Sequence, residues 1–466
     1  MIAKFSGRLH LGTNYAETLL KDGQYHTVLT DGAESTLLSC GLACSECVSG
    51  QNLAQVIKPG LEYERYVLNC LAQNSPAPPL AIHTSAGVPA ALGRFIEELA
   101  CHLPWPGVTD DWFVTLQIEG ASAVLAAVDL MIQIRHCASN DTHSPLDRWH
   151  IGVAATSYHG PPSSSPGSRH PLFDSRHHQI LYPVPSPFMT RDEHNSYLQR
   201  FGAWLEERGA HLACILVEPQ WGSSCAAYCW NKDTLRSVID MAHAKGVLVV
   251  ADEIMCGLGR HSLGTTFLSQ AWQLDVDAVT FGKAIAAGVY PLSGVLVKEN
   301  AALLGAANRT VMQSHTYSGS HVRALMAATE VLKLLPSLYP SMADKSRLLQ
   351  AVMIRFEAQS DGLFVSHGLG LMWGALINRN HPYYAQDSVS ENHRVETTME
   401  MFKTRCKMQS ILPYFVPSGG FMVTPLYDIS DDVIDAIGAR LCTALEALMD
   451  AIAVDLKTAK DAHHAH

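Results

Sequence analysis

The pattern that decides the fold lies in two stretches, VLVVADEIMCGLGRHS at residues 247–262 and DAVTFGKAIAAGVYPLSG at residues 277–294. Each contains a short apolar run rich in β-branched residues, which predicts a strand buried on both faces. Asp252 directly follows the first of these runs, and Gly282 and Lys283 follow the second. Because open α/β sheets bind ligands at the carboxyl ends of their strands, we expect an acid and a lysine at one edge of a sheet.

An acid and a lysine in this arrangement suit pyridoxal phosphate. That cofactor is held as a Schiff base on a lysine, and its pyridinium nitrogen needs an acidic partner to stay protonated. Lys283 would form the Schiff base, Asp252 would be the acidic partner, and Gly282 would leave room for the ring beside the backbone. A buried acid after a strand also serves as a helix cap, and a lysine in a glycine-rich loop is usually solvated. The two residues alone therefore do not decide the chemistry.

The residues around this pair carry a family resemblance. The segments DEIMCGLGR and TFGKAIAAGVYPLSGV resemble the class III (ω-amino acid) aminotransferases of fold type I. The resemblance implies an α/β fold, with a mainly parallel seven-stranded sheet flanked by helices and a smaller α+β domain. On this basis we expect residues 1–75 to form the N-terminal part of the small domain. Residues 76–325 would form the large cofactor-binding domain, and residues 326–466 the C-terminal small domain.

The composition of the chain argues against several kinds of partner. The chain has 466 residues and a net charge of −11, and no basic cluster occurs in it, so we expect no nucleic-acid partner. No run approaches the ~18 apolar residues of a membrane helix, and we expect no membrane partner. The twelve cysteines are scattered, and no second pair accompanies Cys44 and Cys47 at zinc-ribbon spacing. This pattern favours free thiols in a cytoplasmic protein without a metal site.

A candidate phosphate site follows the strand predicted at residues 112–118. Gly120, Ala121 and Ser122 open an apolar helix, and free N–H groups at a helix N-terminus bind anions. An ordinary strand-to-helix turn would look the same. The family carries a Gly-Ser/Thr-Glu/Asp-Ala phosphate loop at this place. The resemblance therefore implies that these three residues bind the cofactor phosphate, mainly through the backbone.

Further residues are implied around the cofactor ring. Tyr158 and His159 follow another predicted strand, where the family has an aromatic residue, a histidine and a glycine. The resemblance implies that Tyr158 stacks on the ring, since a flat aromatic side chain suits that contact, and that Ile254 presses on the opposite face. Glu218 and His159 would support neighbouring side chains or water beside the cofactor.

The segment His315-Thr316-Tyr317-Ser318-Gly319 resembles the family's His-Thr-x-x-Gly sequence. There, the threonine hydroxyl reaches the cofactor phosphate of the neighbouring subunit. The resemblance implies that Thr316 does the same, in a homodimer whose subunits complete each other's active sites.

Three positions depart from the family pattern. Met255 stands where many relatives have glutamine, Phe421 stands in the place of an arginine that grips a carboxylate, and Ser223 replaces the acid that pairs with that arginine. We therefore expect a substrate other than a glutamate-like diacid. An amine, an ω-amino compound or a bulky biosynthetic intermediate fits better.

The remaining elements are predicted more coarsely. Residues 1–75 indicate small strands and turns, and the helix after Gly319 is expected to end near Leu335. A single strand is expected at residues 365–377, and a last helix at residues 431–452. Asp233 is expected to cap the helix that follows it.

Together these patterns predict a pyridoxal-phosphate-dependent aminotransferase. It would move an amino group between an amine, an ω-amino compound or a biosynthetic intermediate and a keto acid or aldehyde, with Lys283 as the general base. A racemase, decarboxylase or lyase on the same fold remains the alternative, and a non-catalytic scaffold homologue a minor one. Neither GxSxG nor GxGxxG follows a predicted strand, so hydrolases and dinucleotide-dependent dehydrogenases find little support.

Overall fold

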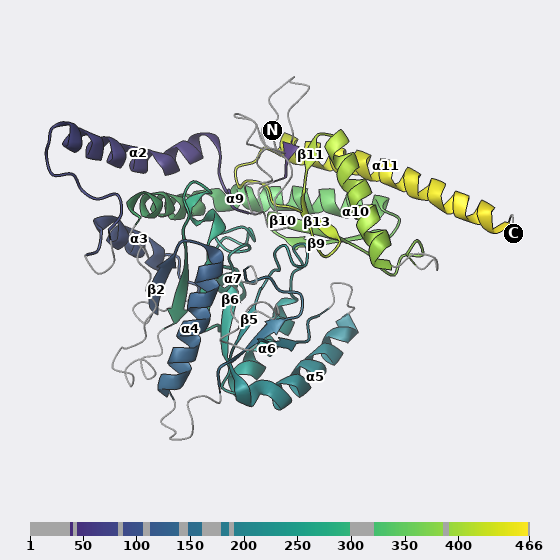
Figure 1. Cartoon of the computed structure of the whole chain (residues 1–466), viewed down its shortest axis with the longest axis horizontal. Coiled ribbons are helices and arrows are strands. Elements are labelled where there is room, and N and C mark those ends of the chain that lie inside the picture. Colours follow the sequence, from purple (N-terminus) through teal and green to yellow (C-terminus); the bar gives the residue numbers. More distant parts are fainter. Residues whose placement is uncertain are drawn as a thin grey trace, which may run out of the picture.

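A computed structural model gives the fold. It describes residues 38–40, 44–82, 87–105, 112–138, 148–160, 179–185, 191–298, 321–384 and 391–464. Within these residues two larger sheets lie on the same side of a long helix, α9 (Val322–Gln359), as Figure 1 shows.

The seven-stranded sheet has the strand order β2-β8-β7-β6-β5-β3-β4. Neighbouring strands are parallel except at β8, which runs antiparallel to both β2 and β7. The prediction of a mainly parallel seven-stranded sheet is therefore confirmed. The strands are β2 (Trp112–Gln117), β3 (His150–Ala154), β4 (Gln179–Tyr182), β5 (Leu212–Val217), β6 (Leu248–Asp252), β7 (Ala278–Phe281) and β8 (Ser293–Lys298).

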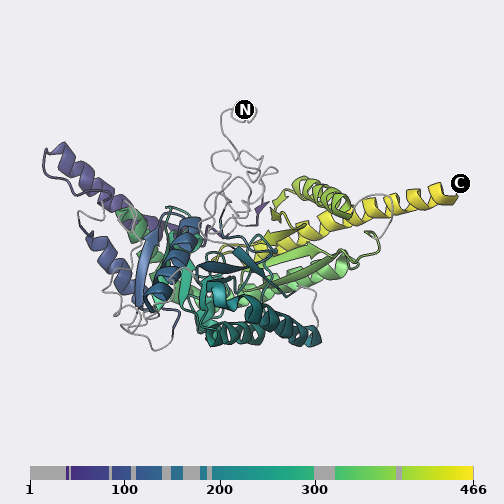
Figure 2. The same ribbon diagram turned by 60° about the horizontal axis from the view of Figure 1, so that its bottom comes forward.

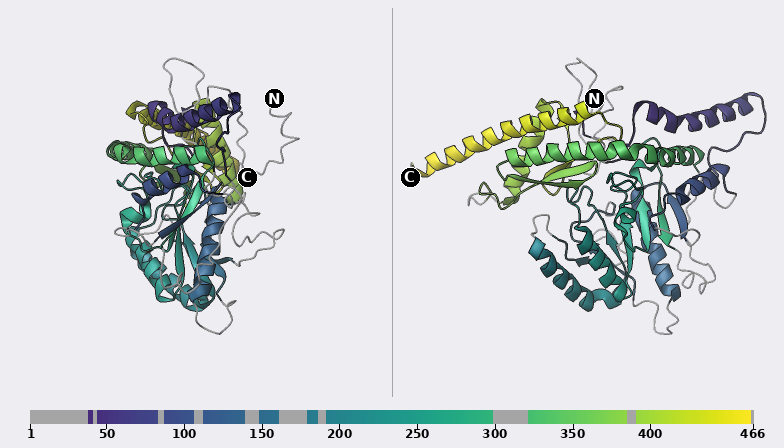
Figure 3. Two further views of the ribbon diagram at one scale, coloured as in Figure 1. Left: turned by 90° about the vertical axis from the view of Figure 1, so that its left-hand side faces the viewer. Right: turned by 180° about the vertical axis from the view of Figure 1, so that it is seen from behind.

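Helices cover both faces of this sheet. Helix α4 (Gly120–Ala138) lies on one face, and α5 (Arg191–Arg208) and α6 (Lys232–Ala244) lie on the other, as the left panel of Figure 3 shows. Every residue of β5 is buried, as expected for a parallel strand between two helical layers. Burial on both faces is why these strands are continuous apolar runs in the sequence.

The four-stranded sheet is antiparallel, with the order β12-β13-β10-β9. Its strands are β9 (Phe364–Leu369), β10 (Met372–Ile377), β12 (Tyr414–Val416) and β13 (Gly420–Val423). Helices α10 (Glu391–Met408) and α11 (Asp431–His464) accompany it, and β1 (Leu38–Ser39) pairs in parallel with β11 (Ile411–Leu412). This part of the chain combines helices with antiparallel strands, as expected for an α+β region.

Helix α9 packs against elements of both sheets. It contacts α2 (Gly50–Ala72), α3 (Ala90–Ala100) and the short 3₁₀ helix η2 (Lys283–Ala286), and also β9, β10 and α11. The purple helix α2 and the yellow helix α11 extend at opposite ends of the molecule in Figures 1 and 2. The predicted domain boundary at residue 326 falls in the first turns of α9, and the division into domains stays a prediction.

Two helices run through prolines, contrary to the sequence-based expectation. Helix α9 does not end near Leu335 but continues through Pro336 and Pro340. Leu335 and Met342 are buried on either side, and this packing compensates for the two lost backbone donors. Residues 1–75 were expected to contain small strands and turns, and the 23-residue helix α2 at 50–72, which contains Pro59, was not predicted.

Three further expectations are wrong. The single strand predicted at residues 365–377 is a hairpin, because the chain reverses at Gly370, whose φ is +65°. A side chain there would also lie 2.2 Å from the carbonyl oxygen of Arg260. The cap of α6 is Asn231 rather than Asp233, since the Asn231 side chain accepts from two backbone N–H groups. The last helix continues past residue 452 to His464.

No described helix combines the length and apolar character needed to cross a membrane.

Candidate active site

The candidate site lies at the carboxyl edge of the seven-stranded sheet. Strands β5, β6 and β7 are neighbours and parallel, with Val217 beside Ala251 and Asp252 beside Thr280. Since each strand ends at the same edge, Asp252 and the residues that follow β5 and β7 come together there. Those residues are Glu218 and Lys283.

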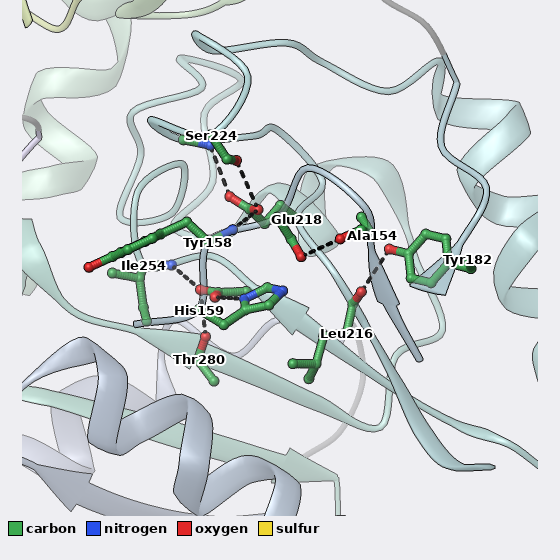
Figure 4. Close-up of polar contacts among 12 residues, drawn as sticks. Ala154, Tyr158, His159, Tyr182, Leu216, Glu218, Ser224, Ile254 and Thr280 are labelled. Carbon is green, nitrogen blue, oxygen red and sulfur yellow. Dashed lines mark hydrogen bonds and ion pairs between the residues drawn. The ribbon is translucent and has the colours of Figure 1, made fainter. Parts of the chain in front are cut away.

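Asp252 is held firmly by its neighbours. Its side chain is 7% exposed. Oδ2 lies 2.8 Å from Nδ1 of His159, and Oδ1 accepts from the Thr280 hydroxyl at 3.0 Å and from the backbone N–H of Ile254 at 3.2 Å (Figure 4). A carboxylate has about four lone-pair sites, so Asp252 can accept one further hydrogen bond without losing these three.

His159 is a buried partner of this carboxylate. Burial lowers the pKa of the imidazole, but the hydrogen bond to Asp252 and the charges of Asp252 and Glu218 outweigh burial and raise its pKa above the ordinary value. Its Nε2 is buried and has no partner among the described residues. His159 thus lies against the Asp252 carboxylate as a buried hydrogen-bond partner.

Glu218 fixes the loops beside this pair. Its carboxylate accepts from the backbone N–H of Tyr158 at 3.3 Å, from that of Gly222 at 2.9 Å and from the Ser224 hydroxyl at 3.5 Å (Figure 4). Burial raises the pKa of Glu218 to about 7, and the charge of Asp252 acts in the same direction, against His159 and the two N–H donors. Glu218 thus ties Tyr158 to the loop after β5.

Tyr158 and Ile254 lie on the same side of this network. In Figure 4 both side chains extend to the left of His159, and the Tyr158 side chain is 50% exposed. Two glycines flank Ile254, since an added Cβ would lie 3.0 Å from its Cδ1 at Gly120 and 3.5 Å from its Cγ2 at Gly282. The missing side chains at both glycines leave room around Ile254.

Lys283 stands at the start of η2 in an uncommon backbone conformation. Its φ is +43°, a region that costs a residue with a side chain on the order of 1–2 kcal/mol. Hydrogen bonds from Ile285 to Gly282 and from Ala287 to Ala284 hold the turn. The side chain is half-buried, and no described residue forms a hydrogen bond or ion pair with its amine. Such strained residues occur often at functional sites.

The predicted phosphate residues form the first turn of α4. Glu119 accepts the first helical bond, from Ala123 at 3.1 Å, and its carbonyl also accepts from the Ser122 hydroxyl at 2.8 Å. Because helical bonding begins at Ala123, the N–H groups of Gly120, Ala121 and Ser122 have no helical acceptor. The contact between Gly120 and Ile254 brings this turn to the Asp252 edge. Thr316 lies outside the described residues.

The family model described as aminotransferase class-III matches residues 82–397, more than half of the chain. The chain belongs to the class-III aminotransferase family. Solved structures of the family's fold agree, although identities this low show the fold alone. A structure described as "co-factor free Transaminase" superposes with a TM-score of 0.72 at 17% identity, covering 90% of this chain and 95% of the other. An (S)-enantioselective ω-transaminase from Thermomicrobium roseum gives 0.71 at 20%, covering 88% and 87%.

The curated relatives match this class-III aminotransferase over shorter parts of the chain. "Uncharacterized aminotransferase YodT" of Bacillus subtilis (strain 168) is 26% identical over 212 residues, 44% of this chain and 46% of its own length. A glutamate-1-semialdehyde 2,1-aminomutase of Chlorobaculum parvum is 26% identical over 285 residues, 58% and 59% of the two chains. This class-III chain therefore matches less than two thirds of either relative.

Arg260, which lies near the site, was not predicted from the sequence. Arg260 is fully buried and donates to the carbonyl oxygens of Leu371, Pro425 and Glu46, at 3.3, 2.7 and 2.7 Å. Its guanidinium also lies over the Tyr427 ring, 4.7 Å from the centroid. The three acceptors belong to three segments far apart in sequence, so no local pattern indicates them. We call this arrangement the Arg260 clamp.

The Arg260 clamp reaches the Lys283 turn through the segment before α2. It holds the carbonyl of Glu46, and the thiol of the next residue, Cys47, donates to the carbonyl of Ala284 at 3.5 Å. Ala284 directly follows Lys283. The clamp thus fixes one wall beside the lysine.

Proposed function

We propose that this class-III chain is a pyridoxal-phosphate-dependent aminotransferase. The observation that carries the proposal is the convergence of a partner-fixed aspartate and an unpaired lysine at one sheet edge. Asp252 keeps three hydrogen bonds in place, while Lys283 has no partner among the described residues. A carboxylate fixed in this way can bind the cationic ring nitrogen of pyridoxal phosphate. A lysine amine without a partner can form a Schiff base with the carbonyl carbon of that cofactor.

The residues present fit the cofactor. Asp252 would hold the ring nitrogen, Tyr158 and Ile254 would enclose the ring, and the first-turn N–H groups of α4 (residues 120–122) would bind the phosphate. Lys283 would hold the cofactor covalently. Pyridoxal phosphate, when bound, supplies an electron sink that stabilises negative charge at the substrate's α-carbon.

Three side chains would have separate roles in the reaction. Asp252 would keep a proton on the ring nitrogen, and His159 and Thr280 hold the Asp252 carboxylate in place for this contact. The Nζ of Lys283, once released as a free amine, would take a proton from the substrate's α-carbon as a general base and return it, as a general acid, to the carbon on the other side of the substrate nitrogen, two bonds away. Glu218 keeps Tyr158 in place through the bond to its backbone N–H.

A homodimer is part of this proposal, with Thr316 reaching the phosphate site of the partner. Helix α2 supports an additional buried surface, since Leu61, Leu68 and Leu71 are 45%, 62% and 58% exposed and recur along one side of the helix. Large apolar side chains grouped in this way commonly mark an interface. Light scattering should give about twice the chain mass of 50.7 kDa, and a monomer mass would contradict the dimer. The cytoplasmic location stays a prediction.

A second candidate is an intramolecular amino transfer. The similarity to a protein named glutamate-1-semialdehyde 2,1-aminomutase favours it. An intramolecular transfer consumes one substrate and needs no separate amino acceptor. Turnover that continues in the absence of any keto acid or aldehyde would therefore favour this candidate over the first.

The absorption spectrum tests the proposal directly. We expect the protein mixed with pyridoxal phosphate to show a visible band that Lys283→Ala abolishes. Lys298→Ala is the matched control, since that lysine pairs with Asp275 at 2.8 Å at the end of β8, and it should keep the band. An amine donor should bleach the band and a keto acid should restore it. A protein that takes up no cofactor would contradict the proposal.

A further inference from the structure

A cavity of about 290 Å³ lies between helix α10 and the hairpin of β12 and β13, in the half of the molecule that contains α11 (Figure 1). Its floor is apolar and consists of Val395 and Met399 on α10 and Phe415 and Val416 on β12. Met399 and Phe415 are only half-buried, so the floor is accessible from outside. We call this cavity the α10 groove.

The rim of the α10 groove is acidic. Glu396 and Glu400 line it, four residues apart on α10. Glu396 has no ion-pair partner among the described residues, and Glu400 stays 67% exposed although Lys403 lies 3.4 Å from it. Lys403 also lines the groove, so two carboxylates face one ammonium group. An occupant with apolar side chains and positive charge therefore fits the groove best.

Residues 1–37, which lie outside the described residues, join the fold beside this groove. They lead into β1, whose Leu38 pairs with Ile411 on β11. Strand β12 begins three residues after Ile411. At ~3.3 Å per residue, Ile411 lies no more than about 13 Å from Phe415 in the floor of the groove.

The first eleven residues, MIAKFSGRLHL, match the groove in chemistry. Ile2, Phe5 and Leu9 are apolar and recur at intervals of three and four residues. Lys4 and Arg8 are basic and stand four residues apart, at the same interval as the two carboxylates on the rim. These eleven residues include no acid, so their charge is opposite to that of the groove.

The connection between these residues and β1 is long enough. Residues 12–37 number 26 (37 − 11) and can span up to ~85 Å when extended. The C-terminal end of α10, at Met408, lies 12 residues beyond Glu396, a distance of about 18 Å along the helix. The first eleven residues can therefore reach the α10 groove of their own chain, where the connection keeps their effective concentration high.

We propose that the α10 groove is the docking site of the chain's own first eleven residues. Their apolar side chains cover the apolar floor, and Lys4 and Arg8 pair with Glu396 and Glu400. This inference does not depend on the proposed aminotransferase function.

The rate of chymotrypsin cleavage after Phe5 tests the proposal. The protease cuts this bond only while the segment is undocked, so the rate follows the undocked population. We expect the full chain to be cut after Phe5 at least about tenfold more slowly than a free peptide of residues 1–11, because the tethered segment is mostly docked. A rate equal to that of the free peptide would overturn the proposal.

Charge reversal locates the contact. Glu396→Lys combined with Glu400→Lys should raise the cleavage rate about fivefold or more, because two attractive pairs become repulsive. Adding Lys4→Glu and Arg8→Glu to this variant should return the rate to within about twofold of wild type. Each rate is taken relative to the free peptide of the same sequence. A rate that does not respond to reversal of the rim, or that does not recover in the combined variant, would refute the groove as the docking site.

The matched control reverses two carboxylates elsewhere. Glu206 and Glu207 on α5 are 69% and 65% exposed, similar to Glu400. Glu206→Lys combined with Glu207→Lys should leave the cleavage rate unchanged. An increase as large as that for the groove variant would show a general effect of net charge and would count against the proposal.

A photocrosslink shows whether the groove belongs to the same chain. With benzoylphenylalanine at position 5, irradiation should link this position to residues 395–403 or 415–419, in a product with the mass of one chain. A product with the mass of two chains would overturn docking within one chain. A link to any other part of the chain would overturn the assignment to the α10 groove.

Discussion

Replacing Arg260 by methionine should loosen three segments at once. The arginine is fully buried, and its guanidinium donates to the carbonyls of Glu46, Leu371 and Pro425. Methionine is a long, flexible side chain of comparable reach, but it donates no hydrogen bond. At ~1 kcal/mol for each buried carbonyl left without its partner, the low end of such costs, the free energy of unfolding should fall by about 3 kcal/mol.

Guanidinium chloride unfolding followed by tryptophan fluorescence measures this loss. The midpoint should fall while the slope with denaturant stays constant, since the surface exposed on unfolding does not change. Limited proteolysis should in addition find faster cleavage in residues 44–48, which the Arg260 clamp holds beside the Lys283 turn.

Arg236→Met is the matched control. That arginine is partly exposed, and its two hydrogen bonds end on one carbonyl, that of Trp272. The control should lose about 1 kcal/mol. If Arg260→Met loses no more than Arg236→Met, and its proteolysis pattern is unchanged, the clamp does not stabilise these segments as inferred.

Three further predictions, the last with a control substitution, concern other parts of the structure. Burial raises the pKa of Glu253 from 4.5 to about 7, so the folded protein binds this proton more tightly than the unfolded chain does. The stability that the bound proton contributes is therefore lost as pH rises from ~4.5 to ~7. Glu253→Gln has no such proton, so its free energy of unfolding relative to wild type should rise over the same pH range in unfolding titrations. Asn231→Ala removes the cap of α6 and should cost about 1 kcal/mol in thermal unfolding. Gly374→Ala should cost at least about 2 kcal/mol, because its Cβ would meet Ala226. Gly93→Ala, in open space on α3, should instead gain about 0.5–1 kcal/mol; a similar result for both alanines would contradict the close packing at Gly374.

The sequence predicts the seven-stranded sheet well because its strands are buried on both faces. An uninterrupted apolar run such as Leu212–Val217 is a local signal, and so is the position of Asp252 at the end of a strand. Proximity of Asp252 and Lys283 then follows from a general rule about parallel sheets. Thr280 could have been found in the same way, since it lies beside Asp252 on the neighbouring strand.

Other features depend on contacts that no local pattern encodes. Helix α9 passes Pro336 and Pro340 because tertiary packing on both sides outweighs two lost donors. The acceptors of Arg260 lie 111, 165 and 214 residues away in the chain. The orientation of Phe421 and Met422 depends on a register of one residue, and a shift by one exchanges the two faces of a strand. Phe421, in the place of the family's arginine, packs against Phe356 and Phe402, and the strand pairing puts Met422 on the opposite face of the sheet.

Helix α9 also fixes the position of the Lys283 turn relative to the four-stranded sheet. It packs against η2, which begins at Lys283, and against β9 and β10, which carry His367 and Gly374. The position of the Lys283 turn relative to β9 and β10 is therefore set by a continuous helix that advances ~1.5 Å and turns ~100° per residue. A related chain could bring the Lys283 turn and the four-stranded sheet closer together or farther apart by moving these contact points along the helix, with no change in Lys283 or Asp252.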